Sequence, residues 1–542
     1  MIKKTTLISL HLFLAVKVLS ASTYYIHPEQ GNDNNDGSSV TSPWQTFKNI
    51  PRLSLKAGDT IALASGTITK GGLVLKDIRG SQNHPLVVTA YHSSSNVKGR
   101  MAIIDAGGFD HGIYLENSSG VLIKGIQITA AGGTPPKGDA KMRCGILVQV
   151  NSPGEYDNIV LDDIRIEDIF FEEEGFKRPK KEVKSANGTQ SYGWGIRFIS
   201  EKDSASITGV TIKNSTIKNV GHTGIKFTGR KNIHEIVVCN NKVLDTGGPG
   251  IQFSGVSKVR VHDNLVNGSG SSDDSRKWGR GSGLWTWNSS DVLIEKNKFM
   301  NANGPGDSAG VHIDFYCSDV IVQYNLSLNN AGGFCEILGD NFNCSYRYNL
   351  SINDGYRIKG VNGAFQEGKT FWLSGYRGNQ ERRGPFNSYF YNNTIYVKKE
   401  IVAKIAIDSK SKGILIANNI FYIEGDIKTV KGDQYKPEDL LENPIDDVVF
   451  TNNLFLKPNS WPTNSVVQPT NSIIGEPGFR NKRGETFQDF VPTRSVIRDK
   501  GMVIRRIPGD SVGIKIGLEV TRDVLGNPIV GLPDIGAIEM QQ

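Results

Sequence analysis

A short pattern of alternating apolar and polar residues recurs along the middle of the chain. Each copy begins with Gly and continues apolar, any residue, apolar, any residue. Alternation with a period of two predicts short β-strands with one face turned inward. Because the same element returns many times, we expect one repeat architecture and not several unrelated domains. The copies lie at residues 112–116, 145–149, 195–198, 224–228, 250–254, 283–287 and 310–314.

A second apolar run that ends in Asn follows each copy, as in residues 292–297 and 320–325. Gly and Asn tolerate the backbone of a tight corner. We therefore predict an all-β fold, a single-stranded right-handed parallel β-helix that resembles the pectate-lyase solenoids, with the Asn side chains stacked as a ladder at one corner. At spacings of 23 to 44 residues, the terminal Asn recurs at Asn214, Asn241, Asn264, Asn297, Asn325, Asn349, Asn393, Asn419 and Asn453.

The first residues are typical of an export signal. Lys3 and Lys4 precede an apolar stretch over residues 7–16, and small residues follow around Ala21. We predict a signal peptide at residues 1–21 and a periplasmic or secreted protein that has no membrane span. The further divisions expected are an N-terminal cap with the first coils at 22–110, the β-helix with the catalytic face at 111–460, and C-terminal coils with a closing segment at 461–542.

Charge and cysteine content exclude several other classes of protein. The net charge of +7 is mild for 542 residues, and the basic residues are scattered apart from residues 177–181. We expect those residues to lie in a loop that projects from a coil at about residues 177–193, and we expect no binding to nucleic acid. The five cysteines include no CxxC pair. This pattern favours buried small side chains over a disulfide framework or a zinc site.

An Asn- and Asp-rich loop at residues 31–37 carries the hard oxygen ligands that Ca²⁺ prefers. A solvated turn is the favoured interpretation, and a structural Ca²⁺ site is the alternative. We predict no other cofactor and no catalytic metal.

The outward-facing positions of the repeats stack into a file that is unlike an ordinary solvated face. This file carries two Trp residues, a His and two cations. Exposed aromatic rings beside polar groups are what a sugar-binding groove needs. His312 has an alternative role as a structural side chain, and the predicted substrate-binding residues are His312, Trp285, Trp287, Gln252, Lys226 and Arg197.

Two carboxylates in consecutive coils are the predicted catalytic pair. Glu336 aligns with Asp314 at a period of 22 residues if two extra residues lie in the following turn. Stacked one coil apart, their carboxyl groups would lie roughly 5 Å from each other, which favours a retaining glycosidase because an inverting enzyme needs about 6.5 to 9.5 Å. The alternative is that Glu336 binds turn amides. Asp307 and Asp340 are the reserve carboxylates.

The segments that contain Asp314 and Glu336 also resemble known enzymes. Residues 311–316 and 329–337 resemble the β-helix glycoside hydrolases of families 120 and 141, which include β-xylosidases. The resemblance implies that Asp314 is the nucleophile and Glu336 the acid/base. The openings at residues 24–44 and 58–61 and the ending at 533–539 also resemble exported carbohydrate-active β-helices.

The predicted function is therefore a retaining glycoside hydrolase, a monomer acting on a poly- or oligosaccharide. One alternative is a polysaccharide lyase on an acidic polysaccharide, for which Lys226 would be the base and Arg197 would neutralise a uronate. Another alternative is a non-catalytic β-helix that binds glycans. A lyase would form an unsaturated product that absorbs in the ultraviolet, and a binding protein would release no reducing sugar.

Overall fold

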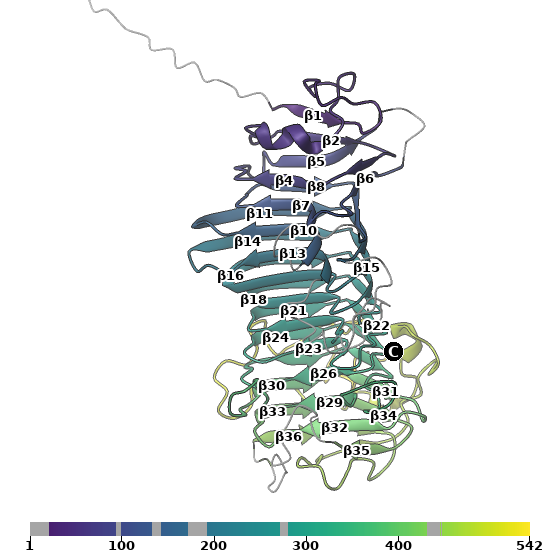
Figure 1. Ribbon diagram of the computed structural model, residues 1–542. Helices are drawn as coiled ribbons and strands as arrows, with labels where there is room; N and C mark the ends of the chain where they lie inside the picture. Colours follow the sequence, from purple (N-terminus) through teal and green to yellow (C-terminus); the bar gives the residue numbers. More distant parts are fainter. Residues whose placement is uncertain are drawn as a thin grey trace, which may run out of the picture.

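The computed structural model describes residues 21–93, 99–132, 142–171, 192–270, 280–430, 445 and 447–541. These residues form a parallel β-helix, in which short strands stack coil upon coil along one axis (Figure 1). Residues 1–20 of the predicted signal peptide lie outside the described residues, and so does the predicted projecting loop as far as residue 191.

The strands form a sheet of 24 strands and a sheet of 14 strands, and the pairing between coils is parallel throughout. The larger sheet contains β1 (Thr23–Ile26), β2 (Thr60–Ala64), β4 (Leu73–Lys76), β5 (Leu86–Tyr91), β7 (His111–Glu116), β8 (Val121–Lys124), β10 (Met142–Val150), β11 (Gly154–Asp162), β13 (Tyr192–Ser200), β14 (Ala205–Lys213), β16 (Ile225–Cys239), β18 (Ile251–His262), β20 (Leu284–Trp287), β21 (Ser290–Glu295), β23 (Val311–Ile313), β24 (Ser318–Gln323), β26 (Gly333–Ile337), β27 (Ser345–Arg347), β29 (Lys369–Leu373), β30 (Phe386–Tyr391), β32 (Ala403–Ile407), β33 (Lys412–Ala417), β35 (Ile427–Thr429) and β36 (Val448–Thr451). The smaller sheet contains β3 (Ile68–Lys70), β6 (Ala102–Asp105), β9 (Ile126–Ala130), β12 (Arg165–Ile169), β15 (Thr216–Val220), β17 (Lys242–Thr246), β19 (Leu265–Asn267), β22 (Lys298–Met300), β25 (Leu326–Leu328), β28 (Leu350–Ile352), β31 (Thr394–Val397), β34 (Ile420–Ile423), β37 (Leu454–Phe455) and β38 (Ile473–Ile474). Short 3₁₀ helices are η1 (Phe47–Arg52), η3 (Phe487–Phe490) and η4 (Ser495–Ile497).

The strand pairings divide the larger sheet into two columns. The first column runs from β4 through β7, β10 and β13, through the first halves of β16 and β18, and on from β20 to β35. The second column runs from β1 to β36, and the long strands β16 and β18 belong to both. The 14-stranded sheet is the third column, so a typical coil contributes one strand to each.

Inward-facing apolar residues fill the space between the three columns. In the first column Phe198, Phe227 and Phe253 stack in successive coils, with ring centroids 4.7 and 5.4 Å apart. All three side chains are fully buried. This interior position follows from the alternation in the sequence, because every second residue of a strand points to the same face.

A column of buried asparagines joins the coils at the corner between the second and third columns. Asn325 is representative: its amide donates to Asn349 Oδ1 in the next coil and to the Ile294 and Gln323 carbonyls, and its own Oδ1 accepts from Asn297. The residue before it, Tyr324, has a φ of 58°, which turns the chain. The predicted ladder is confirmed for Asn241, Asn264, Asn297, Asn325, Asn349, Asn393, Asn419 and Asn453.

The prediction for Asn214 was wrong. Asn214 is exposed, has a φ of 53° and donates to the Asp162 side chain. Ser215 occupies the ladder position in that coil, because its backbone N–H donates to Asn241 Oδ1. Asn214 and Ser215 are adjacent, so the predicted ladder position was one residue too early in this coil.

After β38 the chain folds back along the outside of the solenoid, where Figure 1 shows its yellow-green loops beside the lower coils. Its apolar side chains, such as Ile507 and Ile535, pack on the outer faces of the second and third columns in the coils from about residue 293 onward. The Tyr324 hydroxyl donates to the Arg522 carbonyl over 3.0 Å, and Lys515 forms an ion pair with Asp291. The outer face of the first column carries the cavity described below.

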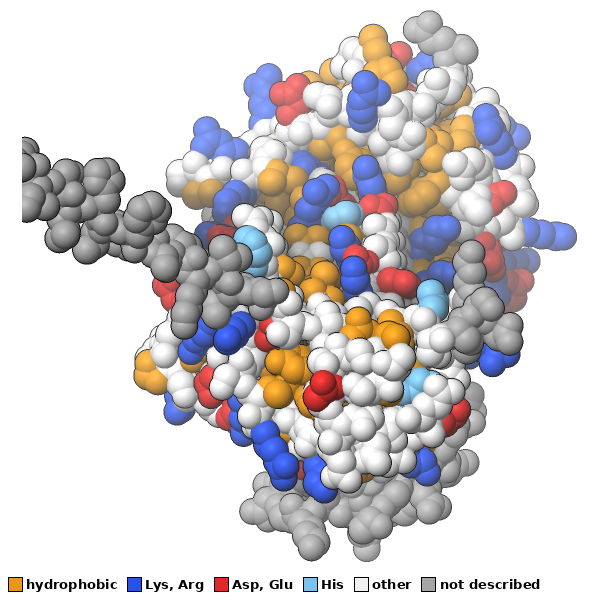
Figure 2. All heavy atoms as spheres, turned by 90° about the horizontal axis from the view of Figure 1, so that it is seen from above, with side chains coloured by type: hydrophobic (Ala, Val, Ile, Leu, Met, Phe, Trp, Pro, Cys, Tyr) orange, Lys and Arg blue, Asp and Glu red, His pale blue; other side chains and the backbone are white. Residues whose placement is uncertain are grey.

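Cysteines and charges are distributed as the sequence indicated. All five cysteines are free and buried, in agreement with the prediction. Basic and acidic side chains are interspersed over the end of the solenoid in Figure 2, with no large area of one sign on that face. Among the residues with a described placement, no helix combines the length and apolar character needed to cross a membrane.

Replacing Asn325 by Ala tests the ladder. The variant leaves buried carbonyl and amide groups of three coils without partners, so we expect the free energy of unfolding to fall by about 2 to 4 kcal/mol. Denaturant unfolding followed by far-ultraviolet circular dichroism measures the change.

The matched control is Asn303→Ala, because Asn303 is exposed and, among the described residues, its one hydrogen bond runs from its backbone N–H to the Ser269 carbonyl. We expect a change within about 0.5 kcal/mol for this variant. Equal effects of the two substitutions would contradict a special role for the ladder.

Candidate active site

The outer face of the first column carries the predicted file of polar and aromatic side chains. Strand pairing places Arg197 opposite Lys226, Lys226 opposite Gln252, Gln252 opposite Trp285 and Trp285 opposite His312. The predicted order of this file is confirmed. A second file lies two residues further along each strand, and it brings Ser254 opposite Trp287.

A cavity of about 360 Å³ opens on this face. It brings together most of the predicted residues, although neither Arg197 nor Glu336 is among those that line it. Tyr376, in the irregular stretch after the site, was expected from the sequence either to wall the pocket or to lie in a solvated loop, and it lines the cavity. Thr228 and Ser254 were not predicted, although they follow the same alternation as Lys226 and Gln252. Arg280 lies in an irregular stretch that carries no such pattern. The lining residues are Lys226, Thr228, Gln252, Ser254, Arg280, Trp285, Trp287, Asp307, His312, Asp314, Phe315, Leu338 and Tyr376.

The predicted alignment of Glu336 with Asp314 was wrong. Ile313 pairs with Ile337, so the coil period here is 24 residues and Glu336 lies opposite His312. No two-residue insertion is needed, because the flanking ladder residues Asn325 and Asn349 keep the same spacing of 24. Glu336 is therefore offset from Asp314 along the strand and lies outside the cavity lining.

Asp314 follows directly after β23, and both of its carboxyl oxygens are held by N–H donors. Trp285 Nε1 donates to Oδ2 over 2.9 Å, and the Phe315 backbone N–H donates to Oδ1 over 2.9 Å. Burial raises the pKa of Asp314 to about 7, while the two donors oppose the rise. The carboxyl group is thus fixed in orientation and is titratable near neutral pH.

Asp307 lies in the loop before β23 and lines the same cavity. Burial raises its pKa, but the positive charge of Arg280, supported by His312 and Arg357, outweighs burial and leaves the pKa below its ordinary value. Arg280 Nη1 lies 3.7 Å from Asp307 Oδ2. The cavity therefore contains two carboxyl groups whose environments move their pKa values apart, which is the usual arrangement of an acid and a base.

His312 lies between the carboxyl groups of its own coil and the next. Its Nε2 is 3.3 Å from Glu336 Oε1 and 3.9 Å from Asp314 Oδ1, so these two oxygens are no more than about 7 Å apart. Burial lowers the pKa of His312 to about 4 and raises the pKa of Glu336 well above its ordinary value. His312 is then neutral near pH 7, so its contact with Glu336 is not an ion pair.

Several buried polar atoms at this site have no hydrogen-bond partner among the described residues. They are both carboxyl oxygens of Asp307, both ring nitrogens of His312, Oε1 of Gln252 and Oε1 of Glu336. Buried polar groups are normally paired, so a cluster of such atoms around one cavity indicates a ligand that supplies the partners. Hydroxyl groups of a sugar can both donate and accept in this way.

Aromatic rings form the walls of the cavity. Trp285 stacks on His312 with ring centroids 5.4 Å apart and an interplanar angle of 11°. Trp287 and Tyr376 both meet Phe315 edge to face. Because pyranose rings pack on such π faces, these walls suit a carbohydrate.

Asp340, the second reserve carboxylate, is engaged elsewhere. Its Oδ2 lies 2.8 Å from Arg377 Nη1, and its Oδ1 lies 3.4 Å from Arg383 Nε.

Within the described residues, no group of three or more His, Cys, Asp or Glu side chains is placed to hold a metal ion. In the loop at residues 31–37, Asp33 and Asp36 accept hydrogen bonds from Thr46 and Ser42.

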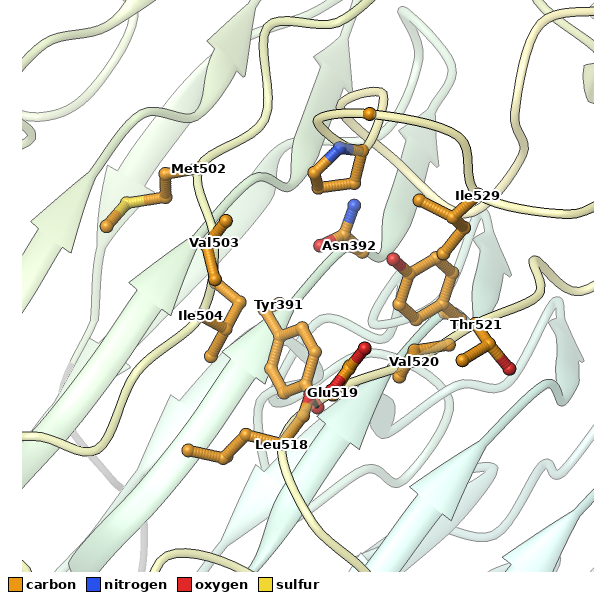
Figure 3. A pocket seen from close by; sticks show the side chains of 13 residues that line it. Tyr391, Asn392, Met502, Val503, Ile504, Leu518, Glu519, Val520, Thr521 and Ile529 are labelled. Carbon is orange, nitrogen blue, oxygen red and sulfur yellow. Dashed lines mark hydrogen bonds between the residues drawn. The ribbon is translucent and has the colours of Figure 1, made fainter.

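A second cavity, of about 290 Å³, lies between the second column and the C-terminal segment. In Figure 3, Val503 and Ile504 face Val520 and Ile529 across it, with Tyr391 between them. Glu519 is the only acidic residue in its lining. Without a pair of carboxyl groups, this cavity lacks the chemistry of the first.

Replacing Asp314 by Asn is expected to stabilise the protein at pH 8 by about 4 kcal/mol in the free energy of unfolding, because a pKa rise of about 3 units costs about 1.4 kcal/mol for each unit. A carboxyl whose pKa is higher in the folded state contributes stability below its unfolded pKa, near 4, and that stability is lost as the pH rises through about 7. The Asn side chain does not ionise, so the variant does not lose this stability at pH 8. At pH 4 the Asp314 carboxyl of the folded wild type is protonated, so the difference in free energy of unfolding between the variant and the wild type should vanish. Denaturant unfolding at the two pH values measures both quantities.

Asp203→Asn is the matched control, because the Asp203 side chain is 82% exposed and its ion pair with Arg230 is long, at 3.8 Å. A gain for Asp314→Asn that is equal at pH 4 and pH 8, or no gain at all, would contradict the assigned electrostatics.

Comparison with known proteins agrees with the fold. Residues 195–395 match the family model described as the right handed beta helix region. The curated lacto-N-biosidase of Bifidobacterium longum subsp. longum is 22% identical over an alignment that covers 97% of this chain and 37% of that protein. The chain thus spans little more than a third of the length of this curated relative.

Solved structures give the same result. The crystal structure of the GH136 lacto-N-biosidase from Eubacterium ramulus superposes with a TM-score of 0.53 at 18% identity, covering 75% of this chain and 68% of that chain. The complex of XylC with xylose has a TM-score of 0.48 at 12% identity, covering 96% and 98% of the two chains, which is too low to bear on function. The chain is a right-handed parallel β-helix, as its sequence predicted.

Proposed function

We propose that this protein is a glycoside hydrolase that acts on a poly- or oligosaccharide by the retaining mechanism. The observation that carries the proposal is the cavity that joins two carboxyl groups of unlike pKa, Asp307 and Asp314, to aromatic walls and unpartnered polar atoms. The similarity to a lacto-N-biosidase over 97% of the chain supports the same class of reaction.

Asp314 is the proposed nucleophile. Its two N–H donors, Trp285 Nε1 and the Phe315 backbone, hold the carboxylate in one plane and stabilise its charge. In the first step an Asp314 oxygen would attack the anomeric carbon while the glycosidic bond breaks, forming a glycosyl ester. In the second step water would attack the same carbon and release Asp314. This chemistry needs no metal or cofactor.

Asp307 replaces Glu336 as the proposed acid/base. Asp307 lines the cavity, and neither of its oxygens has a hydrogen bond of normal geometry in the described part of the chain, with Arg280 Nη1 3.7 Å from Oδ2. The carboxyl group would exchange a proton with the leaving group and with water in the cavity. Asp307 and Asp314 interact electrostatically, so the pair would hold one proton near neutral pH. Glu336 would act through His312 as a positioning residue, because its carboxyl lies 3.3 Å from that ring.

The pKa values of the free protein alone favour the opposite roles, since the proton resides more readily on Asp314 than on Asp307. The donors on Asp314 favour the first assignment because they stabilise the anion that attacks. An experiment must decide which of Asp314 and Asp307 is the nucleophile and which is the acid/base.

Chemical rescue by azide separates the roles. Activity on aryl glycosides and natural oligosaccharides, including lacto-N-biosides, would first identify a substrate of the wild type. Asp314→Ala and Asp307→Ala should each lower kcat on a substrate with a poor leaving group by about 10³-fold or more. On an aryl glycoside whose leaving group departs without a proton donor, azide should restore turnover in both, giving a glycosyl azide of retained configuration with Asp307→Ala and of inverted configuration with Asp314→Ala.

Glu336→Gln serves as the comparison, with an expected loss of only about 10- to 100-fold and no azide product. The reverse pattern of azide configurations would exchange the two roles. Full activity in both alanine variants would overturn the proposed site, and so would azide rescue of Glu336→Ala with retained configuration, which would return the acid/base role to Glu336.

A polysaccharide lyase is the second candidate, because burial lowers the pKa of Lys226 to about 7, the range expected for a base. A lyase would yield a product absorbing in the ultraviolet without uptake of water. Recording absorbance during the same assays decides between the two reactions.

A further inference from the structure

Lys226 is a buried cation in the wall of the active-site cavity. Its side chain belongs to β16, and the residue is only 5% exposed. The ammonium group lies 5.0 Å from the centre of the Trp194 ring. Among the described residues no carboxylate lies within ion-pair distance of it. Lys226 therefore faces the cavity without an ion-pair partner in the described part of the chain.

The surroundings of Lys226 make its charge more costly. Burial, together with the positive charge of Arg197 opposite it in the neighbouring coil, lowers the pKa of Lys226 to about 7, while the charge of Glu201 opposes the change. A buried charge is normally paired, and leaving one unpaired is strongly unfavourable. An anion bound in the cavity at this point would compensate the charge of Lys226.

The other cation of the cavity is already engaged. Arg280 lies 3.7 Å from the Asp307 carboxylate, and its charge is what lowers the pKa of Asp307. An anionic group on a ligand near Arg280 would also meet the negative charge of Asp307. Lys226 is the better-placed partner, because the cavity lining around it, Thr228 and Gln252, is uncharged.

The distance along the solenoid places this cation away from the bond to be cleaved. Lys226 lies three coils from His312 through Gln252 and Trp285, which corresponds to about 14 Å at the spacing of parallel strands. That length accommodates more than one pyranose ring. Gln252 lies between, with its buried Oε1 unpartnered in the described structure and able to accept from a sugar hydroxyl.

We propose that Lys226, with Gln252 beside it, forms a subsite for an anionic substituent of the glycan, a carboxylate or a sulfate ester, on a sugar ring that neighbours the cleaved one. The location of this ring relative to the cleaved bond rests on the proposed function. The anionic preference itself rests only on the cavity and its unpaired cation.

Equilibrium binding tests the subsite without turnover. The probes are methyl β-D-glucuronide against methyl β-D-glucoside, and glucose 6-sulfate against glucose, titrated at pH 6 and followed by tryptophan fluorescence, since Trp194 adjoins Lys226. For at least one anionic probe, the dissociation constant of the wild type should be lower than that of the matched neutral probe by about tenfold or more. The tighter of the two anions identifies the substituent as carboxylate or sulfate.

Lys226→Gln should abolish this preference, whereas Lys226→Arg should keep it. The matched control is Lys242→Gln, which removes the same charge from an exposed position on β17 and should leave the preference unchanged. If Lys226→Gln does not fold, the wild type and Lys226→Arg still decide the question. Equal binding of anionic and neutral probes by the wild type, or an undiminished preference in a folded Lys226→Gln variant, would overturn the proposal.

The result is separable from the proposed reaction. If Asp314→Ala and Asp307→Ala retain hydrolysis, the catalytic assignment fails while the anionic preference stands or falls by binding alone. If those variants lose hydrolysis but no anionic probe is preferred, the catalytic assignment stands and the subsite is wrong.

Discussion

From Asn241 to Asn453, buried asparagines hold each coil in register with the next. The amide of Asn325 bridges to Asn349 in the following coil and caps carbonyl groups in its own coil and the one before. Because these groups are buried, a slip of one residue would leave them without partners, at a cost of several kcal/mol per coil. Loops between coils can therefore differ in length while the strands above and below stay aligned.

That fixed register is what assembles the candidate site from distant parts of the sequence. Gln252, Trp285 and His312 are far apart along the chain, yet they lie side by side because their strands pair without offset. The rigid stack also accommodates the unfavourable burial of Asp307, Asp314 and Lys226, since groups arranged for binding or catalysis commonly reduce stability. In the coils from about residue 293 onward, the C-terminal segment packs on the outer faces of the other two columns.

Period-two alternation and recurring Asn were sufficient to predict the fold and the order of the outward file. The errors arose where residues were aligned by a local motif and not by the spacing of the repeats. Aligning Glu336 with Asp314 ignored the spacing of 24 residues between Asn325 and Asn349, which the coil follows. Asp307 and Arg280 could not be brought together from sequence, because the loops that carry them have no period and their contact depends on the three-dimensional path of the chain.

The central claim is that Asp314 forms a covalent bond to the sugar during the reaction. Trapping with a panel of 2-deoxy-2-fluoroglycosyl fluorides, followed by proteolysis and mass spectrometry, tests it directly. The account predicts one adduct per chain, on the peptide that contains Asp314, and time-dependent loss of activity that a good acceptor sugar reverses. An adduct on another carboxylate, or inactivation-free turnover with inversion of configuration, would contradict it.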